Sequence, residues 1–230
     1  YGLGLVYRQQ GKYDDAQNEF ERDLTLNRQL SNRQNEAKAL NALGHVELLR
    51  RNYHEAIQYY QQTLEIRRTI GDRAGEGASL LSLAQGLGYL GDHGQVEPLL
   101  REALKIHQAI NHRWYEISTW NELGILYLMI GELDEARTSL DEGLALSRKI
   151  ANETGQAYLL CNLGQVLREQ DQLEQAEHAL LEGLKLAETQ GDVNLEAIYF
   201  SDLAMVSLGA KRFEEATQRA STSLEKFRSL

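Results

Sequence analysis

Apolar and small residues recur along this chain with a period of forty residues. Stepping by forty from Leu24 meets a leucine every time, as far as Leu224. Three more ladders keep the same step without an insertion: Ala16, Ala56, Val96, Ala136, Ala176, Ala216; Phe20, Tyr60, Leu100, Leu140, Leu180, Ala220; and Gly4, Gly44, Ala84, Gly124, Gly164, Ala204. Self-similarity at a fixed period of this length indicates an array of repeats.

Within one copy, the pattern predicts two helices joined by a short polar turn. Leu40, Leu43, Gly44 and Leu48 approximate the spacing of an amphipathic helix, and a second apolar stripe begins after the polar residues 51–52. The stretch GDRAG at 71–75 supplies a glycine to stop one helix and an aspartate to cap the next. Each copy therefore predicts a helical hairpin.

Six such copies predict an all-α fold, a right-handed α-solenoid of about six antiparallel helical hairpins. We expect a single repeat domain over residues 1–230. The repeats should span about 1–32, 33–72, 73–112, 113–152, 153–192 and 193–230.

The stretch GLGYLG at 86–91 has the spacing of a dinucleotide-binding loop, but its context predicts a helix end. The fingerprint needs a preceding strand and a following helix. In the forty-residue register, Gly86 and Gly88 fall inside a helix, and Gly91 falls where Gly11 and Gly131 also end one. Pro98 soon afterwards predicts either a kink or a second helix that starts late, near Gly94 or Gln95.

Composition narrows the classes of partner. No apolar run approaches the length of a membrane span, and no signal peptide begins the chain. The net charge is −10, and the acidic excess lies in residues 116–230, which would repel nucleic acid. A single cysteine is compatible with the reducing cytoplasm, where we expect the protein to reside.

Catalytic and metal-binding chemistry find little support. His107 and His112 are five residues apart, so we expect their rings on different sides of a helix, whereas a metal pair needs a spacing of three or four. Cys161 has no evident histidine or acid partner in the sequence, which predicts an inert thiol. We expect no enzyme activity, no cofactor and no metal.

The order large, Leu, Gly, Ala, aromatic at Leu40, Leu43, Gly44, Ala56 and Tyr60 resembles the tetratricopeptide repeat family, in a forty-residue variant. The resemblance covers the whole chain, although the proline usual after the second helix is missing. The string GDRAGEGASLLSLAQGLGYLGD is similar to the Leu-Gly-Asn repeats of G-protein signalling modulators, and also to sensor arrays of bacterial signalling ATPases and transcription regulators. The repeat consensus does not separate these two.

The resemblance implies a concave groove lined by the first helix of each copy. Helical register predicts a peptide-binding groove of amides and aliphatic side chains, with little charge: Asn41, His45, Leu48, Leu81, Gln85, Asn121, Ile125, Leu128, Tyr158, Gln165, Arg168 and Met205. Such a mixture suits the backbone and apolar anchors of a protein or peptide partner. We therefore expect a non-enzymatic interaction scaffold; the alternative is a ligand-sensing regulatory array.

The ends of the chain predict a fragment of a longer protein. Tyr1 aligns with Asn41, so the first helix should lack its opening turn. Phe227 and Leu230 continue an apolar stripe with no following helix to cover it, whereas a solenoid needs a polar cap.

Overall fold

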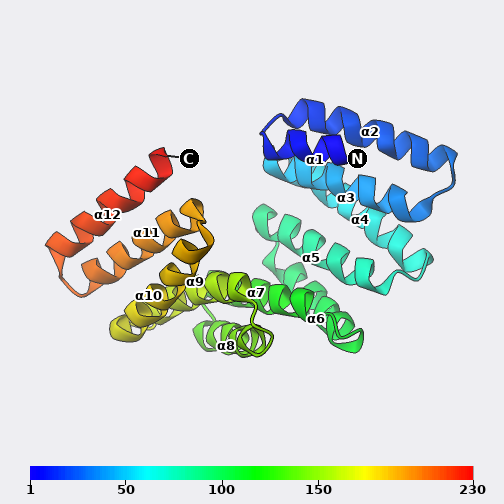
Figure 1. Cartoon of the computed structure of the whole chain (residues 1–230). Helices are drawn as coiled ribbons and strands as arrows, with labels where there is room; N and C mark the ends of the chain where they lie inside the picture. The colour runs from blue at the N-terminus through cyan, green and yellow to red at the C-terminus, as the bar shows by residue number, and fades with distance from the viewer. Residues whose placement is uncertain (230) are drawn as a thin grey trace. The chain divides into compact units, whose positions relative to one another are not determined.

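The computed structural model describes residues 1–229 and consists of helices joined by short turns (Figure 1). No strand occurs among these residues, which confirms the all-α prediction. The helices are α1 (Gly2–Gln9), α2 (Tyr13–Gln29), α3 (Arg33–Leu49), α4 (Tyr53–Thr69), α5 (Arg73–Leu90), α6 (His93–Ala109), α7 (Arg113–Ile130), α8 (Leu133–Lys149), α9 (Glu153–Glu169), α10 (Leu173–Gln190), α11 (Val193–Gly209) and α12 (Phe213–Arg228).

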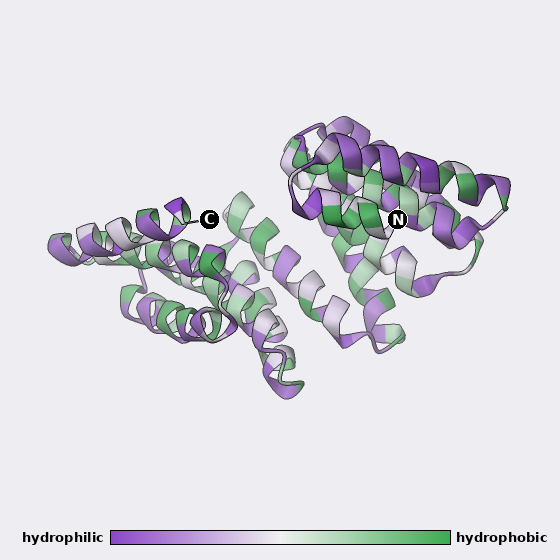
Figure 2. Cartoon of the chain, turned by 45° about the horizontal axis from the view of Figure 1, so that its top comes forward, coloured by the Kyte–Doolittle hydropathy of each residue, from purple (hydrophilic) through white to green (hydrophobic). Residues whose placement is uncertain are grey.

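The helices form the predicted hairpins, each made of a first helix, called the A helix, and a second, called the B helix. The A helices are α1, α3, α5, α7, α9 and α11. The chain divides into two compact units, with the boundary in the sequence falling within α7: unit 1 is Tyr1–Tyr115, and unit 2 starts at Glu116. Apolar and polar residues are mixed along the individual helices (Figure 2), so each helix has apolar residues to bury and polar residues to leave in water.

The turns repeat one backbone conformation every twenty residues. Each contains one residue with positive φ, between 53° and 84°. The following N–H bonds back to the carbonyl five residues earlier, as from Asp72 to Arg67, which satisfies an otherwise unpaired carbonyl at the helix end. Glycine occupies five of these positions, including the predicted stops Gly11, Gly91 and Gly131. The other six are Ser31, Arg51, Asn111, Ala151, Asp171 and Lys211.

Helix starts follow the sequence only in part. Asp72 caps α5, as predicted, with a carboxylate oxygen that accepts the Gly75 N–H at 2.9 Å. Pro98 lies at the sixth position of α6, which begins at His93 rather than at the later start that the proline suggested. The helix continues through the proline because Pro98 is exposed, so water can reach the carbonyl that loses its usual donor.

Glycines of the small-residue ladder let the two helices of a hairpin approach closely. A Cβ atom added at Gly44 would lie 2.5 Å from the Tyr60 ring, and one at Gly164 would lie 2.5 Å from Leu180. Tyr60 and Leu180 are both fully buried. The recurrence of small residues in this ladder is therefore a packing requirement.

Buried glutamates in the first turn of several A helices tie them to the preceding B helix. Glu76 is only 5% exposed, and one of its oxygens accepts a hydrogen bond from Arg68 of α4 at 3.0 Å. Its other oxygen pairs with Arg73 of its own helix. Glu36 makes the equivalent pair with Arg28 at 3.0 Å. Burial strengthens such charge-assisted hydrogen bonds.

We expect Glu76→Gln to lower the free energy of unfolding by about 1–2 kcal/mol, because it weakens two charge-assisted bonds at a buried site. Urea titration followed by circular dichroism measures the change. The control is Glu19→Gln, since Glu19 pairs with an arginine that is 77% exposed and should cost less than about 0.5 kcal/mol. Equal losses in the two variants would contradict this account.

The described residues contain no helix with the length and apolar character needed to cross a bilayer. Phe227, predicted to continue an uncovered apolar stripe, is 44% exposed on α12. Leu230, the other residue of that prediction, lies outside the described residues.

Candidate functional site

The twelve predicted site residues all lie on A helices and are all at least partly exposed. We call the side of these helices that carries them the A-helix face. Tyr158 and Met205 are exposed, and the other ten are half-buried. They occur on α3, α5, α7, α9 and α11, and each unit is described here by itself.

In unit 1, the His45 side chain packs against a residue of the buried core. Its Nδ1 lies 3.1 Å from the Tyr60 hydroxyl, and the two rings meet edge to face at 5.4 Å. Burial, with smaller contributions from the positive charges of Arg8 and Arg67, lowers the pKa of His45 from 6.5 to about 4. His45 is therefore a neutral packing residue at physiological pH.

The remaining unit 1 residues of the prediction divide between two helices. Asn41 and Leu48 belong to α3, and Leu81 and Gln85 belong to α5. The Asn41 Oδ1 atom is buried and has no hydrogen-bond partner among the described residues. No pair of these four residues is joined by a hydrogen bond in the described chain.

In unit 2, the structure links residues of successive A helices. Asn162 of α9 donates a hydrogen bond to the Asn121 Oδ1 atom of α7 at 2.8 Å. Gln165 of α9 donates to the Asp202 carboxylate of α11, also at 2.8 Å. These amide contacts hold neighbouring A helices in register along the A-helix face.

Three predicted residues line one pocket, which lies near the C-terminal ends of α7 and α9. Leu128 of α7 and Gln165 and Arg168 of α9 surround a cavity of about 370 Å³, which we call the A-helix pocket. Gly131, Leu133 and Glu169 complete its lining. The Arg168 guanidinium donates to the Glu169 carboxylate at 2.8 Å. The pocket thus places aliphatic surface beside an amide and a paired charge.

The other unit 2 residues of the prediction lie outside this pocket. Ile125 is half-buried on α7, and Met205 is exposed on α11. Tyr158 of α9 is hydrogen-bonded to Asp192, the N-cap of α11; burial and this carboxylate raise the pKa of the tyrosine. None of these three residues lines the A-helix pocket.

Cys161 has an acid partner, contrary to the sequence expectation. Its thiol donates to the same Asp202 oxygen that Gln165 contacts, at 3.5 Å. Burial first, and then the neighbouring carboxylate, raises the pKa of the thiol well above its ordinary value. The sulfur therefore stays protonated and unreactive. The acid partner does not make the thiol a nucleophile, so the prediction of an inert thiol is unchanged.

Sequence reasoning also missed three polar residues of the A-helix face in unit 2: Glu122, Asn162 and Asp202. They follow one another at forty-residue steps from Ala42 and Ser82. That ladder starts with small residues and so resembles a packing position. The signal that could have revealed these residues is the change from small side chains in α3 and α5 to larger polar ones from α7 onwards.

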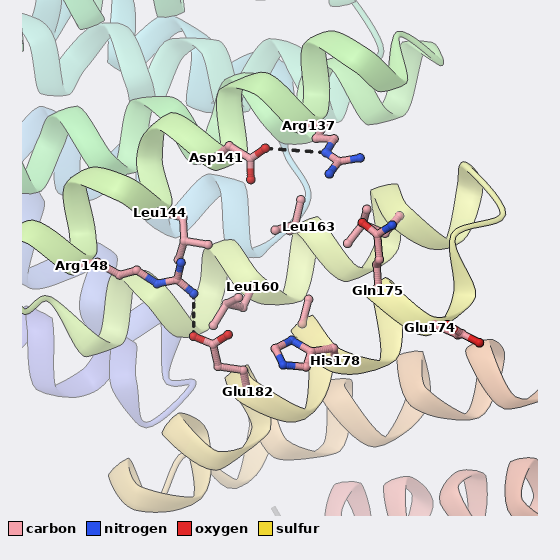
Figure 3. Close-up of a pocket in the computed structure, with 12 residues that line it drawn as sticks. Arg137, Asp141, Leu144, Arg148, Leu160, Leu163, Glu174, Gln175, His178 and Glu182 are labelled. Carbon is pink, nitrogen blue, oxygen red and sulfur yellow. Dashed lines mark hydrogen bonds and ion pairs between the residues drawn. The ribbon is translucent and has the colours of Figure 1, made fainter.

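A second pocket in unit 2 lies between two B helices, α8 and α10, with α9 beneath (Figure 3). Its volume is about 420 Å³, and its floor is formed by buried leucines such as Leu160. Arg148 and Glu182 pair across it at 2.7 Å, from α8 to α10. The A-helix reasoning did not predict this pocket, because its walls belong to B helices.

The rings of His107 and His112 lie closer together than their five-residue spacing predicted. The His107 and His112 ring centroids are 6.4 Å apart, because α6 ends at Ala109 and the chain turns back before His112. In the described part of the chain, no three His, Cys, Asp or Glu side chains gather as a metal ion would need.

Comparison with known protein families identifies helical repeats in this sequence. The sequence model of the tetratricopeptide repeat matches residues 1–69, 35–109 and 115–189. No curated protein sequence matches the chain significantly.

Solved structures share the fold at low sequence identity. BtubC (BKLC) from P. vanneervenii has a TM-score of 0.80 at 15% identity, over 94% of this chain and 91% of that one. Aspartyl phosphate phosphatase F from Bacillus subtilis has a TM-score of 0.80 at 13% identity, over 100% of this chain and 59% of that one. The Rap conjugation gene regulator of the plasmid pLS20, solved in complex with the Phr peptide, has a TM-score of 0.72 at 18% identity, over 86% and 55%. This chain thus spans a little over half of the last two.

Proposed function

The chain belongs to the tetratricopeptide-repeat family, and we propose that it is a non-enzymatic interaction module that binds a peptide or helix of a protein partner on its A-helix face. The A-helix pocket carries the proposal. It gathers an aliphatic wall, an amide and a guanidinium at the ends of α7 and α9, in a volume that accommodates a side chain of a bound peptide.

Hydrogen-bonding groups next to the pocket support an extended ligand. An amide can donate to a peptide carbonyl and accept from a peptide N–H, so a row of amides suits main-chain recognition. The Rap conjugation gene regulator, similar in fold, has been solved with a peptide. The phosphatase among the similar structures shares the fold alone, so it lends no catalytic role to this chain.

The proposal includes the cytoplasm as the location, where a lone thiol stays reduced. It also includes the absence of nucleic-acid and membrane partners, because the acidic excess of unit 2 repels phosphate backbones and anionic lipids.

Selection from a phage library of random 12-residue peptides tests the proposal. Peptides selected on the wild-type chain are then measured by fluorescence anisotropy against Leu128→Asp. We expect the substitution to weaken binding by at least about tenfold, because it places a charge on the aliphatic wall of the pocket.

The matched control is Leu181→Asp, which changes an exposed leucine of the B helix α10. It should leave binding unchanged, and circular dichroism checks that both variants stay folded. Failure to select any peptide, or equal losses in the two variants, would refute binding at the A-helix face.

A further inference from the structure

The pocket between α8 and α10, which we call the B-helix pocket, combines an apolar floor with charged walls (Figure 3). Arg148 and Glu182 bridge it from one helix to the other at 2.7 Å. The pocket lies within unit 2 and shares no lining residue with the A-helix pocket. Its floor consists of four leucines that are each at most 8% exposed: Leu144, Leu160, Leu163 and Leu167.

Unit 1 contains the same groove between α4 and α6, but without the charges on one wall. Arg68 pairs across that groove with a glutamate of α6, also at 2.7 Å. However, α4 carries Ile57 and Gln61 at the positions where α8 carries Arg137 and Asp141. Leucines again occupy the four floor positions: Leu64, Leu80, Leu83 and Leu87. A charged pair on this wall is therefore not required for packing one B helix beside the next.

Arg137 and Asp141 are paired only loosely. The Arg137 Nε atom lies 3.7 Å from the Asp141 Oδ2 atom, which is too far for a hydrogen bond. Arg137 donates instead to the Gln172 side chain at 3.1 Å, and Asp141 makes no hydrogen bond within residues 1–229. The wall formed by α8 thus offers a cationic donor and an anionic acceptor, one helical turn apart, beside the leucine floor.

We propose that the B-helix pocket binds a free aliphatic amino acid. The side chain of the ligand lies on the leucines, its carboxylate accepts from the Arg137 guanidinium, and its ammonium group donates to Asp141. An amino acid carries both charges on one carbon, so it matches two neighbouring groups of opposite charge. The volume of about 420 Å³ lies within the range of small-molecule pockets.

The charge of the whole lining favours a ligand that brings an ammonium group as well as a carboxylate. Two arginines and three acidic residues line the pocket. A carboxylate alone would add to this negative excess, whereas a zwitterion adds no net charge. The site goes beyond the proposed peptide binding, because it lies between B helices and takes a small molecule.

An NMR titration of the isotope-labelled chain with leucine tests the inference. Backbone amide signals of α8 and α10 should shift and saturate, and those of α4 and α6 should stay in place. The analogue 4-methylpentanoate lacks the ammonium group, and 3-methylbutylamine lacks the carboxylate. Each should bind about 3- to 10-fold more weakly than leucine, because it loses one partly exposed charge contact. Glycine should bind at least about tenfold more weakly, because it lacks the apolar side chain.

Two variants assign the charges of the ligand to residues. Asp141→Asn should weaken leucine binding by about 3- to 10-fold without weakening 4-methylpentanoate, which has no ammonium group to lose a partner. Arg137→Gln should weaken leucine binding equally without weakening 3-methylbutylamine. A variant that merely disturbed the groove would lose affinity for both of its ligands.

Three further variants locate the site. Ala179→Leu places in the pocket the residue that unit 1 carries at this position, Leu99, and should abolish leucine binding by filling the space. Glu142→Gln removes a charge from an exposed position of α8 outside the pocket and should change nothing. Leu128→Asp, which alters the A-helix pocket, should also leave leucine binding unchanged. Circular dichroism checks that each variant is folded.

The assignment is overturned if leucine causes no saturable shift on α8 and α10, or if it shifts α4 and α6 as strongly. It is also overturned if leucine and its two analogues bind equally well. None of these results bears on peptide binding at the A-helix face, which the phage selection decides separately.

Discussion

Replacing Gly183 by alanine should lower the free energy of unfolding of the chain by about 3 kcal/mol. A Cβ atom at this position of α10 would lie 1.8 Å from the Tyr199 hydroxyl of α11. Tyr199 is fully buried, and its hydroxyl donates to the Ala157 carbonyl, so the ring cannot move without losing a buried hydrogen bond. Urea titration followed by circular dichroism measures the loss.

Gly88→Ala is the control, and it should have the opposite sign. No atom lies within 4 Å of a Cβ added at Gly88 in α5, so the substitution should stabilise the helix by as much as about 1 kcal/mol. The double variant Gly183→Ala/Tyr199→Leu should lose less than the sum of its single changes, because a leucine, as at Gly143 and Leu159, leaves more room. Additive losses would show that the clash is not the cause.

Acid should destabilise the chain through His45. The pKa of His45 is about 4 in the folded protein and near 6.5 when exposed, so the unfolded chain binds the proton first as the pH falls. The stability supplied by the neutral ring is complete above pH 6.5 and is lost between pH 6.5 and 4. The loss amounts to as much as about 3 kcal/mol.

His45→Gln should remove this part of the pH dependence, since Gln85 and Gln165 occupy the same position in other copies. Urea titrations at pH 7.5 and pH 4.5 give the difference, and subtracting the variant from the wild type cancels the titration of the carboxylates. His54→Gln, which changes an exposed histidine of α4, should keep the wild-type slope. An unchanged slope in His45→Gln would contradict the assignment.

The helices were predictable because every copy repeats the same packing problem. Gly44 meets Tyr60 and Gly164 meets Leu180, so one glycine ladder reports the same close approach in several hairpins. A mutation that breaks one hairpin leaves the ladder visible in the others. This redundancy let one sequence reveal helices, turns and hairpins without a homologue.

The contacts of individual side chains were less predictable, because they depend on partners in the next copy. Cys161 and Asp202 are 41 residues apart, and nothing in the ladder of either residue announces the contact. The turns present the same difficulty: Arg51 and Ala151 adopt the positive φ that glycine favours, so the position is set by the helices on each side.

Equal turns every twenty residues would allow whole copies to be duplicated or exchanged without altering the backbone, yet the junctions restrict which copies can be neighbours. Tyr199 needs a glycine in the copy before it, and Gly183 supplies one. At the same position, the third copy carries Ala103 and the second carries Thr63, so either copy placed directly before α11 would clash with the Tyr199 ring. The order of the copies is therefore restricted. Recombination within the array must keep each large buried residue next to a preceding copy that carries a small residue at the facing position.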